Sequence, residues 1–467
     1  MTTPAIGSHD PALNDEGWVR RFFNATEIDT RMLGMVGALL VIWAGFDIYS
    51  GILRPGDGLF GGSFLTPRNL WILMVQTSSI AVMATGMVLV IVMRQIDLSV
   101  GSMLSFISVS VGYLQVYGLG PTLGVGHPAI WIIAVLFGLA MGALLGCFNG
   151  ILIAYLKIPS FIVTLGGLIA YSGLAWWVIR GETVAPMDQT YKLIGGNGPL
   201  ASIGPLWSWI LAFFACGGIV TAIITGRQQR RRFKFPLRPI WAETVIGVVG
   251  SLIVLGTTWL VNSYPWAPKV IEKYALEHNI PIPEGTLDVS GDAICREGDK
   301  IVRCVSGLSY ETGYAIPVLI VISVGFLMTF LATRMRFGRY VFATGGNPEA
   351  AVLAGVNTKR LTVMIFTLMG VLVAISALIS TARLDSATNS LGQFNELYVI
   401  AAAVIGGTSL AGGIGTIYGA LLGALLMQSL QSGMTLLNFP SAYKDMVVGG
   451  VLVTAVWVDQ MYQSRVK

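Results

Sequence analysis

The stretch LYVIAAAVIGGTSLAGGIGTIYGALLGALLMQSLQSGMTLLNFPSAY, residues Leu397–Tyr443, decides the fold of this chain. It contains no Asp, Glu, Lys or Arg, and since a helix crosses the bilayer core with about 20 apolar residues, it allows two passages. Its middle is crowded with residues that break helices: Gly406, Gly407, Gly412, Gly413, Gly415 and Gly419. Irregular, uncharged backbone at membrane depth is tolerated only where protein or a water-filled path surrounds it. The pattern therefore indicates a transport path rather than an anchor.

The composition excludes a soluble enzyme. Of the 467 residues 54% are hydrophobic and 11% charged, and the mean hydropathy is +0.73, whereas a soluble chain carries about 25% charged residues. The net charge of +5 comes from clustered basic residues, which indicate membrane topology rather than a nucleic-acid surface. Residues 1–30 are polar and mixed in charge, so we expect no signal peptide.

Apolar stretches recur along the whole chain and predict an all-α, polytopic membrane protein. They are 33–53, 70–93, 98–118, 128–156, 158–179, 204–225, 241–262, 314–333, 361–382, 397–413, 415–436 and 441–458. Several are irregular: 158–179 begins with Pro159, and the last contains Lys444 and Asp445. We therefore expect about 10 full spans, with the other stretches as broken or re-entrant helices.

Basic residues set the orientation. The loop 227–238 carries six basic residues and no acid, and the loop 334–360 carries five against one acid. Cytoplasmic loops hold an excess of Lys and Arg, so both loops, the tail 1–32 and the C-terminus are predicted to be cytoplasmic. Residues 33–467 then form one transmembrane domain, and the polar segment 263–313 is a small periplasmic insertion.

Two sequence features have more than one interpretation. Cys295 and Cys304 lie together in the insertion, where an oxidising space would favour a disulfide; otherwise they are unrelated thiols. The string GALLG occurs at 142–146 and at 419–423, and Ile-Pro-Ser and Phe-Pro-Ser follow these strings. Alternating spans would run the first string inward and the second outward, as in an inverted repeat, although strings of small residues also recur by chance.

No motif for catalysis or energy supply is found. Nothing in the sequence matches a P-loop, an HExxH helix or a paired-cysteine metal site. The histidines His9, His127 and His278 are scattered. We therefore expect no cofactor, no metal and no enzymatic activity.

Asp97, in the stretch MRQIDLSVG (93–101), is the interior residue most suited to chemistry. An ionisable group near the membrane interior is a candidate for function. Asp followed by Leu98 and Ser99 is also an ordinary helix start, because its carboxylate accepts hydrogen bonds from free N–H groups. Arg94, three residues earlier, is near enough in sequence to form an ion pair with it. The sequence leaves the structural and the substrate-contacting roles open.

The segment GGNPEAAVLAGVN (345–357) predicts a helix of about two turns between two spans. Asn347 can cap it, Pro348 suits its first position, Glu349 favours the first turn and Gly355 is a natural stop. A short exposed helix of this kind suits docking into a groove of another protein. A solvated connecting helix is the other interpretation.

The same segment resembles the cytoplasmic coupling segment of monosaccharide permeases in the ribose/xylose class of ABC importers. Three more stretches are similar to that family's signatures and occur in the same order: IDLSVGSM at 96–103, IPSFIVTLGGL at 158–168 and AVIGGTSLAGGIGT at 403–416. Within the class the likeness is greatest to the xylose permeases, because of the stretch 437–443 and the chain length. The insertion departs from the compact pattern of the family.

The resemblance implies a permease subunit of the cell inner membrane, usually a homodimer. Its partners would be a cytoplasmic ABC ATPase, which hydrolyses the ATP, and a periplasmic sugar-binding protein. The substrate would be a monosaccharide, D-xylose first, with ribose or another pentose or hexose as the alternative. The residues that couple to the ATPase would be Gly345, Gly346, Asn347, Glu349, Ala350, Ala351 and Gly355.

Polar groups near the path can exchange hydrogen bonds with sugar hydroxyls without a charge penalty. The candidates are Asp97, Ser99, Asn149, Ser160, Thr164, Thr408 and Ser409. An ion-coupled secondary sugar transporter is the rival class, and it needs buried carboxylates on spans, for which the sequence offers Asp47, Asp97 and Asp445. A membrane-bound enzyme would need a nucleophile–base pair or a metal set, which the sequence lacks.

Overall fold

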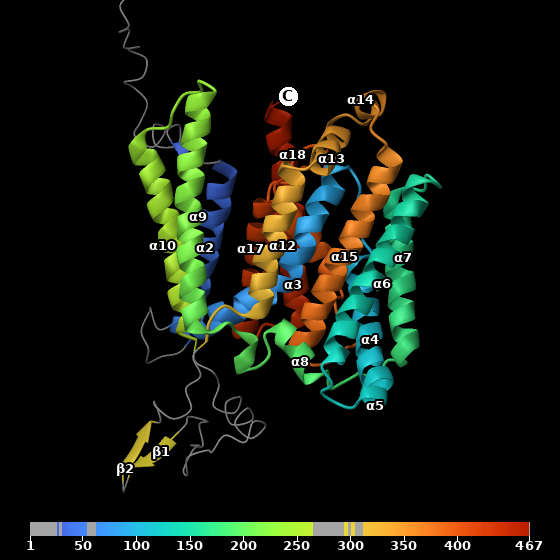
Figure 1. Cartoon of the computed structure of the whole chain (residues 1–467), viewed down its shortest axis with the longest axis vertical. Helices are drawn as coiled ribbons and strands as arrows, with labels where there is room; N and C mark the ends of the chain where they lie inside the picture. Colours follow the sequence, from blue (N-terminus) through green and yellow to red (C-terminus); the bar gives the residue numbers. More distant parts are fainter. Residues whose placement is uncertain are drawn as a thin grey trace, which may run out of the picture. The chain divides into compact units, whose positions relative to one another are not determined.

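The chain divides into two compact units (Figure 1). The computed structural model describes residues 26–27, 30–53, 62–264, 294–297, 300–303 and 312–466. Unit 1 comprises residues 1–34 and 209–259, and unit 2 comprises residues 35–208 and 260–467. Each unit has its own contacts, and each is described separately.

Each predicted apolar stretch contains a helix, although the stretch 397–413 is helical only to Ile405. The helices are α2 (Thr30–Ile52), α3 (Pro67–Val92), α4 (Val100–Tyr113) continued by η2 (Leu114–Leu119) and α5 (Gly120–Leu123), α6 (Ala129–Ala154), α7 (Ser160–Ile179), α9 (Gly204–Arg232), α10 (Ile240–Asn262), α12 (Ile316–Thr333), α15 (Thr358–Leu384), α16 (Asn395–Ile405), α17 (Ile417–Leu436) and α18 (Ser441–Val466). Within the described ranges, nine helices are long and apolar enough to cross a membrane. With only 11 residues, α16 is one of the expected broken helices. The prediction of an all-α polytopic protein is confirmed.

Short elements join the long helices. They are α8 (Gln189–Lys192), η3 (Leu193–Gly195), η4 (Pro199–Ala201), α13 (Arg336–Gly346) and α14 (Pro348–Leu353). Two short strands, β1 (Ile294–Glu297) and β2 (Lys300–Arg303), pair as an antiparallel hairpin inside the predicted insertion. They are a small exception to the helical pattern.

One prediction is corrected by the extent of a helix, and two others fall wholly or partly outside the described residues. The basic segment 227–238 was expected to be a loop, but α9 continues to Arg232, so its first half is helical. Cys304 lies outside the described residues, so the disulfide with Cys295 stays a prediction. Most of the insertion 263–313 and residues 1–25 also lie outside the described residues.

In unit 1, acidic residues hold the basic end of α9. Glu27 pairs with Arg230 Nη2 at 2.5 Å and with Arg238 Nη2 at 2.8 Å. Arg227 pairs with Glu243 of α10 at 2.6 Å. The hydrogen bonds from Arg230 and Arg238 lower the pKa of Glu27 to about 2. Because the folded-state pKa is lowered, this contribution is present above the ordinary pKa of 4.5 and is lost as the pH falls toward 2.

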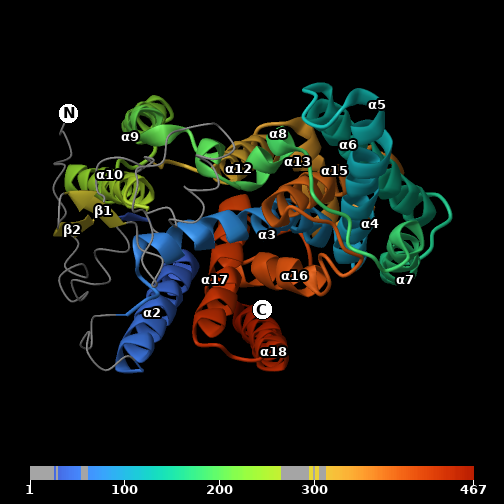
Figure 2. The same ribbon diagram turned by 90° about the horizontal axis from the view of Figure 1, so that it is seen from below.

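In unit 2, α3 is the central helix. Of the 18 most apolar consecutive residues in this helix, 94% are buried. Figure 2 shows α3 passing among α12, α15, α16 and α17, all of which contact it. A helix that is hydrophobic all round belongs in the interior of a bundle. Therefore α3 is surrounded by protein, whereas helices farther out in the unit, such as α6 and α7, keep one exposed face.

Several elements of unit 2 meet where α3 ends, next to α13 and α14; we name this region the α14 end (Figure 1). The C-terminal part of α6 lies there, because Asn149 bonds to Ser99. The start of α17 also lies there, because the preceding loop bonds through Gly413 to Val92. The two helices that carry GALLG therefore run in opposite directions, as an inverted repeat requires.

The turns after the two GALLG helices have the same local structure. Lys157 has φ 58° and precedes Pro159 by two residues; Asn438 has φ 56° and precedes Pro440 by two residues. A new helix begins directly after each proline, at Ser160 and at Ser441. A shared turn after a shared string favours the repeat over chance.

Within unit 2, α2 and α18 finish at opposite ends. Asp47 and Ser50, near the end of α2, accept hydrogen bonds from Leu65 N and Ser63 N just before α3. Since α3 runs toward the α14 end, the end of α2 lies at the end of unit 2 away from it. Figure 1 shows α18 finishing at the α14 end.

The insertion leaves and rejoins unit 2 at one place. The hydroxyl of Thr312, the first described residue after it, donates to Val261 O at 2.9 Å and to Tyr264 O at 3.1 Å. Next to it, Gly313 O accepts a hydrogen bond from Trp71 near the start of α3. This place is therefore at the end of unit 2 opposite the α14 end.

Glycines allow α6 and α15 to touch through their backbones. A Cβ on Gly142 would lie 2.3 Å from Gly370 O, and one on Gly370 would lie 2.1 Å from Gly142 O. A Cβ on Gly146 would lie 2.2 Å from Phe366 O. Small residues at such positions let membrane helices approach closely, and backbone atoms cannot move aside as side chains do.

We expect Gly370→Ala to destabilise the protein. The added methyl group has to push α6 away from α15, and overpacking of this kind costs about 1–3 kcal/mol. The matched control is Gly166→Ala on α7, where an added Cβ has nothing within 4 Å; alanine there should be neutral or stabilising by up to about 1 kcal/mol. The measurement is the thermal unfolding midpoint in detergent. Equal midpoints for the two variants would contradict the contact.

Candidate functional site

A buried chain of hydrogen bonds links α7, α6 and the start of α4. Tyr171 OH donates to Asn149 Oδ1 at 2.7 Å, and Asn149 Nδ2 donates to Ser99 Oγ at 3.1 Å. Ser99 Oγ in turn donates to Asp97 Oδ1 at 2.6 Å. All four side chains are buried. Because each donor has an acceptor, the chain fixes how the three segments meet.

Two more candidate residues belong to this cluster. Ser160 Oγ accepts from Ile96 N at 3.3 Å. Thr164 Oγ1 donates to Ser160 O at 2.9 Å and approaches Ile96 O at 3.3 Å. The structure therefore brings together five of the predicted path residues: Asp97, Ser99, Asn149, Ser160 and Thr164. Sequence reasoning missed Tyr171, although its spacing from Ser160 and Thr164 places it on the same face of α7.

The geometry of Asp97 agrees with its structural role. Its Oδ1 accepts both Ser99 N, at 2.9 Å, and Ser99 Oγ, and α4 begins at the next residue. The ion pair considered between Asp97 and Arg94 is not formed. Arg94 instead donates from Nε to Gly345 O and from Nη2 to Gly346 O, both at 2.8 Å. The end of α13 offers free carbonyl groups, which attract a guanidinium.

Thr408 and Ser409 lie apart from the cluster, in the loop 406–416 between α16 and α17. This loop closes on itself through Ser409 N, which donates to Ile414 O at 2.9 Å. It also bonds to α3 through Gly413 N and Val92 O at 3.0 Å. Both side chains are buried, and Ser409 Oγ accepts from Ala411 N at 3.2 Å, which supports the loop.

The predicted two-turn helix is present as α14. Asn347 Oδ1 accepts from Ala350 N at 3.0 Å, Pro348 is the first helical residue, and Gly355 has φ +82°. The preceding helix, α13, was not predicted. In α14 only Ala351 is buried, whereas Leu353 is 89% exposed. An exposed apolar side chain at a protruding turn suits contact with another protein.

The segment 345–355 is held tightly to unit 2 at its first residues. A Cβ on Gly345 would lie 1.9 Å from Val92 O. Gly412, at φ +87°, leaves room for Arg94, whose Cγ would be 2.4 Å from a Cβ there. The start of the segment thus touches the end of α3 and the loop 406–416 at once, so a force on α14 reaches both.

A polar pocket, which the sequence reasoning missed, lies between α4, α7 and the segment 389–396. Its volume is about 310 Å³. It is lined by Gly101, Ser102, Ser105, Leu168, Ser172, Asn389, Ser390, Gln393, Phe394 and Glu396; we name it the serine pocket. The available signal was the polar run 385–396, which ends directly before the uncharged stretch.

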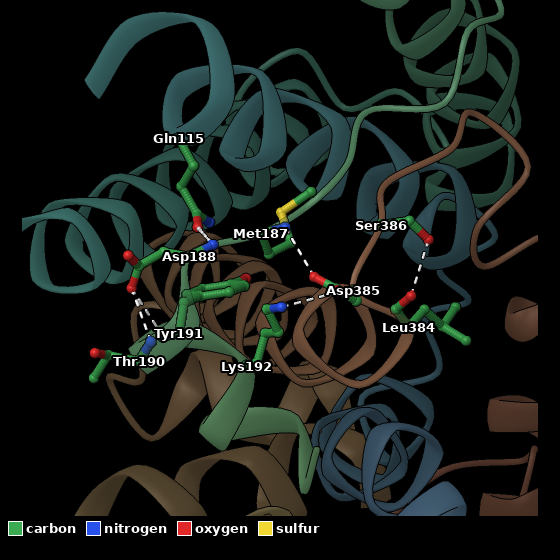
Figure 3. Close-up of polar contacts among 9 residues, drawn as sticks. All are labelled: Gln115, Met187, Asp188, Thr190, Tyr191, Lys192, Leu384, Asp385 and Ser386. Atoms are coloured by element: carbon green, nitrogen blue, oxygen red, sulfur yellow. Dashed lines mark hydrogen bonds and ion pairs between the residues drawn. The ribbon is translucent and has the colours of Figure 1, made fainter. Parts of the chain in front are cut away.

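The segment that lines the serine pocket is anchored just before it (Figure 3). Asp385 Oδ1 accepts from Met187 N at 2.9 Å, and its Oδ2 pairs with Lys192 Nζ at 3.0 Å. Two backbone bonds, at 3.0 and 2.9 Å, join Val184 and Ala387. Both oxygens of the Asp385 carboxylate therefore have a partner, one in α8 and one just before it. These bonds fix the position at which the pocket-lining segment begins.

No cluster of three or more His, Cys, Asp or Glu side chains suited to a metal occurs among the described residues. The arrangement consists instead of a central buried helix, a broken helix beside a polar pocket, and a protruding turn that is bonded to Arg94 just after the central helix and lies against the loop that follows the broken helix. It defines a polytopic membrane permease with a surface for a partner.

Comparisons with known proteins agree. The family model described as "Branched-chain amino acid transport system / permease component" matches residues 69–456, so the chain belongs to this family of permeases. Xylose transport system permease protein XylH of Haemophilus influenzae is 33% identical over 95% of this chain and 100% of its own length. XylH of Escherichia coli is 34% identical over 86% of this chain and 88% of its own. No solved structure is significantly similar.

The ribose import permease protein RbsC of Escherichia coli is also similar, at 28% identity over 86% of this chain and 88% of its own length. The four motifs thus indicated the right family. These relatives are transport permeases, which agrees with the expectation that the chain is not an enzyme.

Asp97 can be tested by two substitutions. Asp97→Asn keeps an oxygen that accepts from Ser99, so we expect nearly unchanged stability and transport. Asp97→Leu leaves the buried Ser99 N–H without its acceptor, which costs about 1–3 kcal/mol and should lower the thermal unfolding midpoint. Loss of transport by a fully stable Asp97→Asn protein would show that the charge itself acts on the substrate.

Proposed function

We propose that this chain is the membrane subunit of an ATP-driven importer for a monosaccharide. D-Xylose is the first candidate, because XylH of Haemophilus influenzae and XylH of Escherichia coli, both more than 30% identical to this chain, are called xylose transport system permease proteins. Ribose or another pentose or hexose is the alternative, supported by the similarity to RbsC. ATP would be hydrolysed on a separate ABC ATPase, in keeping with the missing P-loop.

The observation that carries this proposal is the junction between α14 and the end of α3. A helix that docks on an ATPase has to be exposed on one side and firmly attached on the other. Leu353 and Glu349 are exposed, whereas Gly345 contacts Val92 and accepts a bond from Arg94. Closure of the ATPase would move α14, and Arg94 would transmit the movement to α3 and the start of α4.

The coupling residues divide into two roles under this proposal. Gly345 and Gly346 form the attachment, since their carbonyls bind Arg94. Asn347 and Gly355 set the limits of α14 by capping and by a left-handed backbone. Glu349 and Ala350 are exposed and would touch the ATPase, and Ala351 packs the helix onto unit 2.

The same proposal includes an orientation in the membrane and a set of partners. The α14 end would face the cytoplasm, and both chain termini with it. The opposite end, from which the insertion leaves, would face the periplasm and a sugar-binding protein. We propose that two copies of the chain form a homodimer in the cell inner membrane, as the family resemblance implies.

Of the three carboxylates that the sequence offered for ion coupling, Asp445 is exposed and the other two already have local partners. Asp47 is used by Leu65 N, and Asp97 by Ser99. A cation-coupling site needs carboxylates that can change partner during transport. Both of these hold local structure instead.

Glu349→Lys tests the coupling surface. Reversal of an exposed charge should leave insertion and stability unchanged but repel the site on the ATPase, so we expect stimulation of the partner ATPase to fall at least about tenfold, or about 1.4 kcal/mol of interaction. The control is Glu182→Lys, an exposed carboxylate beyond the far end of α7, which should leave stimulation normal. Normal coupling in the Glu349 variant would remove that residue from the role.

Reconstitution tests the function as a whole. Vesicles that contain the chain, its ATPase and its binding protein should accumulate D-xylose when supplied with ATP, even when the proton and sodium gradients are collapsed. Omission of the ATPase should abolish uptake. Uptake by the chain alone, driven by a gradient, would contradict the proposal and favour the secondary transporter.

A further inference from the structure

The serine pocket lies at the start of a helix that is too short to cross the membrane. Glu396 stands at the start of α16, which has 11 residues. At 1.5 Å per residue this helix is about 16 Å long, about half of the 30 Å bilayer core. Its other end leads into the loop 406–416, which is bonded to the end of α3. Glu396 therefore stands at the opposite end of α16 from the loop that reaches the α14 end.

The carboxylate of Glu396 is buried without a partner residue. The side chain is 8% exposed. Within the described part of the chain, no other residue forms a hydrogen bond or an ion pair with it. An unpaired carboxylate inside a membrane protein is costly and is tolerated where it faces a polar cavity that serves function. Glu396 lines just such a cavity.

The position of this carboxylate depends on a glycine. A Cβ on Gly101 would lie 2.1 Å from Glu396 Oε2 and 2.5 Å from Gly392 O. Gly101 thus lets the Glu396 carboxylate and the segment 389–396 approach α4 closely. Phe394, in the same pocket-lining segment as Glu396, has φ 65°, a left-handed backbone that is strained for a bulky residue. Strain of this kind clusters at ligand sites.

We propose that the serine pocket binds one monosaccharide molecule during passage, with the Glu396 carboxylate accepting hydrogen bonds from two sugar hydroxyls and Phe394 covering an apolar C–H face. This inference rests on the proposed function. At about 310 Å³ the pocket is at the lower end of the range for small-molecule sites. Three serines line the pocket: Ser102, Ser105 and Ser172. The hydroxyls of Ser102 and Ser105 donate to Ser99 O at 3.0 Å and to Asn389 O at 2.7 Å, so their oxygens offer acceptors for the hydroxyls of a polyol.

The pocket suits a neutral polyol better than an amino acid. No Lys, Arg or His is among its lining residues, so an α-carboxylate would find no cation and would lie near Glu396. A branched aliphatic side chain would have only Leu168 and Phe394 as apolar contacts. The chemistry of the pocket therefore favours a sugar over the branched-chain amino acids after which the family is described.

The test uses the chain with its ATPase and binding protein in vesicles. Glu396→Ala should lower ATP-dependent uptake of D-xylose about 10- to 100-fold, the change that corresponds to about 1.5–3 kcal/mol for hydrogen bonds to a charged group. Stimulation of the ATPase by loaded binding protein should stay within about twofold. Glu396→Gln, which keeps an acceptor oxygen, should retain an intermediate rate. Thr85→Val, a buried change on α3 outside the pocket, should transport normally.

A second measurement does not depend on the Glu396 variants. In a variant whose four native cysteines are replaced by serine, Ser172→Cys should react with a maleimide more slowly as D-xylose is added. Leucine at the same concentration should give no protection. Protection by leucine but not by D-xylose, or by neither, would overturn the proposal.

The outcomes separate this inference from the proposed function. If the wild-type complex transports D-xylose with ATP while Glu396→Ala transports equally well, the pocket is not on the path but the function stands. If the wild-type complex transports no monosaccharide, the proposed function fails. Uptake that requires sodium or a proton gradient in the wild type and loses this requirement in Glu396→Gln would identify a cation site instead.

Discussion

The rest of unit 2 depends on the backbone at the end of α3. In a membrane every peptide group needs a partner within the protein, and Val92 O obtains one from Gly413 N of the loop 406–416. Gly345 packs against the same carbonyl without a side chain between them. Three segments distant in sequence thus share one contact point, and none can shift far without disturbing the other two.

Local signals in the sequence predicted the helices and the helix ends. Asn347 and Gly355 act at short range, and a cap or a left-handed residue is specified by its own neighbours. The partners of Arg94 could not be predicted in this way, because they lie 251 and 252 residues away. Proximity in sequence suggested Asp97 instead, and carbonyl groups at the end of an unpredicted helix, α13, proved to be the acceptors.

The candidate path shows the same division between local and distant information. Five of its residues meet in one cluster because they stand at the ends of consecutive helices. Glu396 was not predicted as a path residue, because it stands just before the uncharged stretch 397–443 that indicated the path. Its burial follows from Gly101, almost 300 residues earlier, and a missing Cβ gives no sign in the sequence of what will occupy its space. Polar residues that support structure and those that face a cavity look alike until the helices are placed.

The hydrogen bonds of Thr312 to Val261 and Tyr264 have a consequence for how such proteins change over time. Because both edges of the insertion are tied to each other, the length of the chain between them adds only the slowly growing entropy of a closed loop. Lengthening, shortening or exchange of this segment should therefore leave the helical bundle intact. The site therefore offers a place for grafting a reporter domain onto this membrane protein.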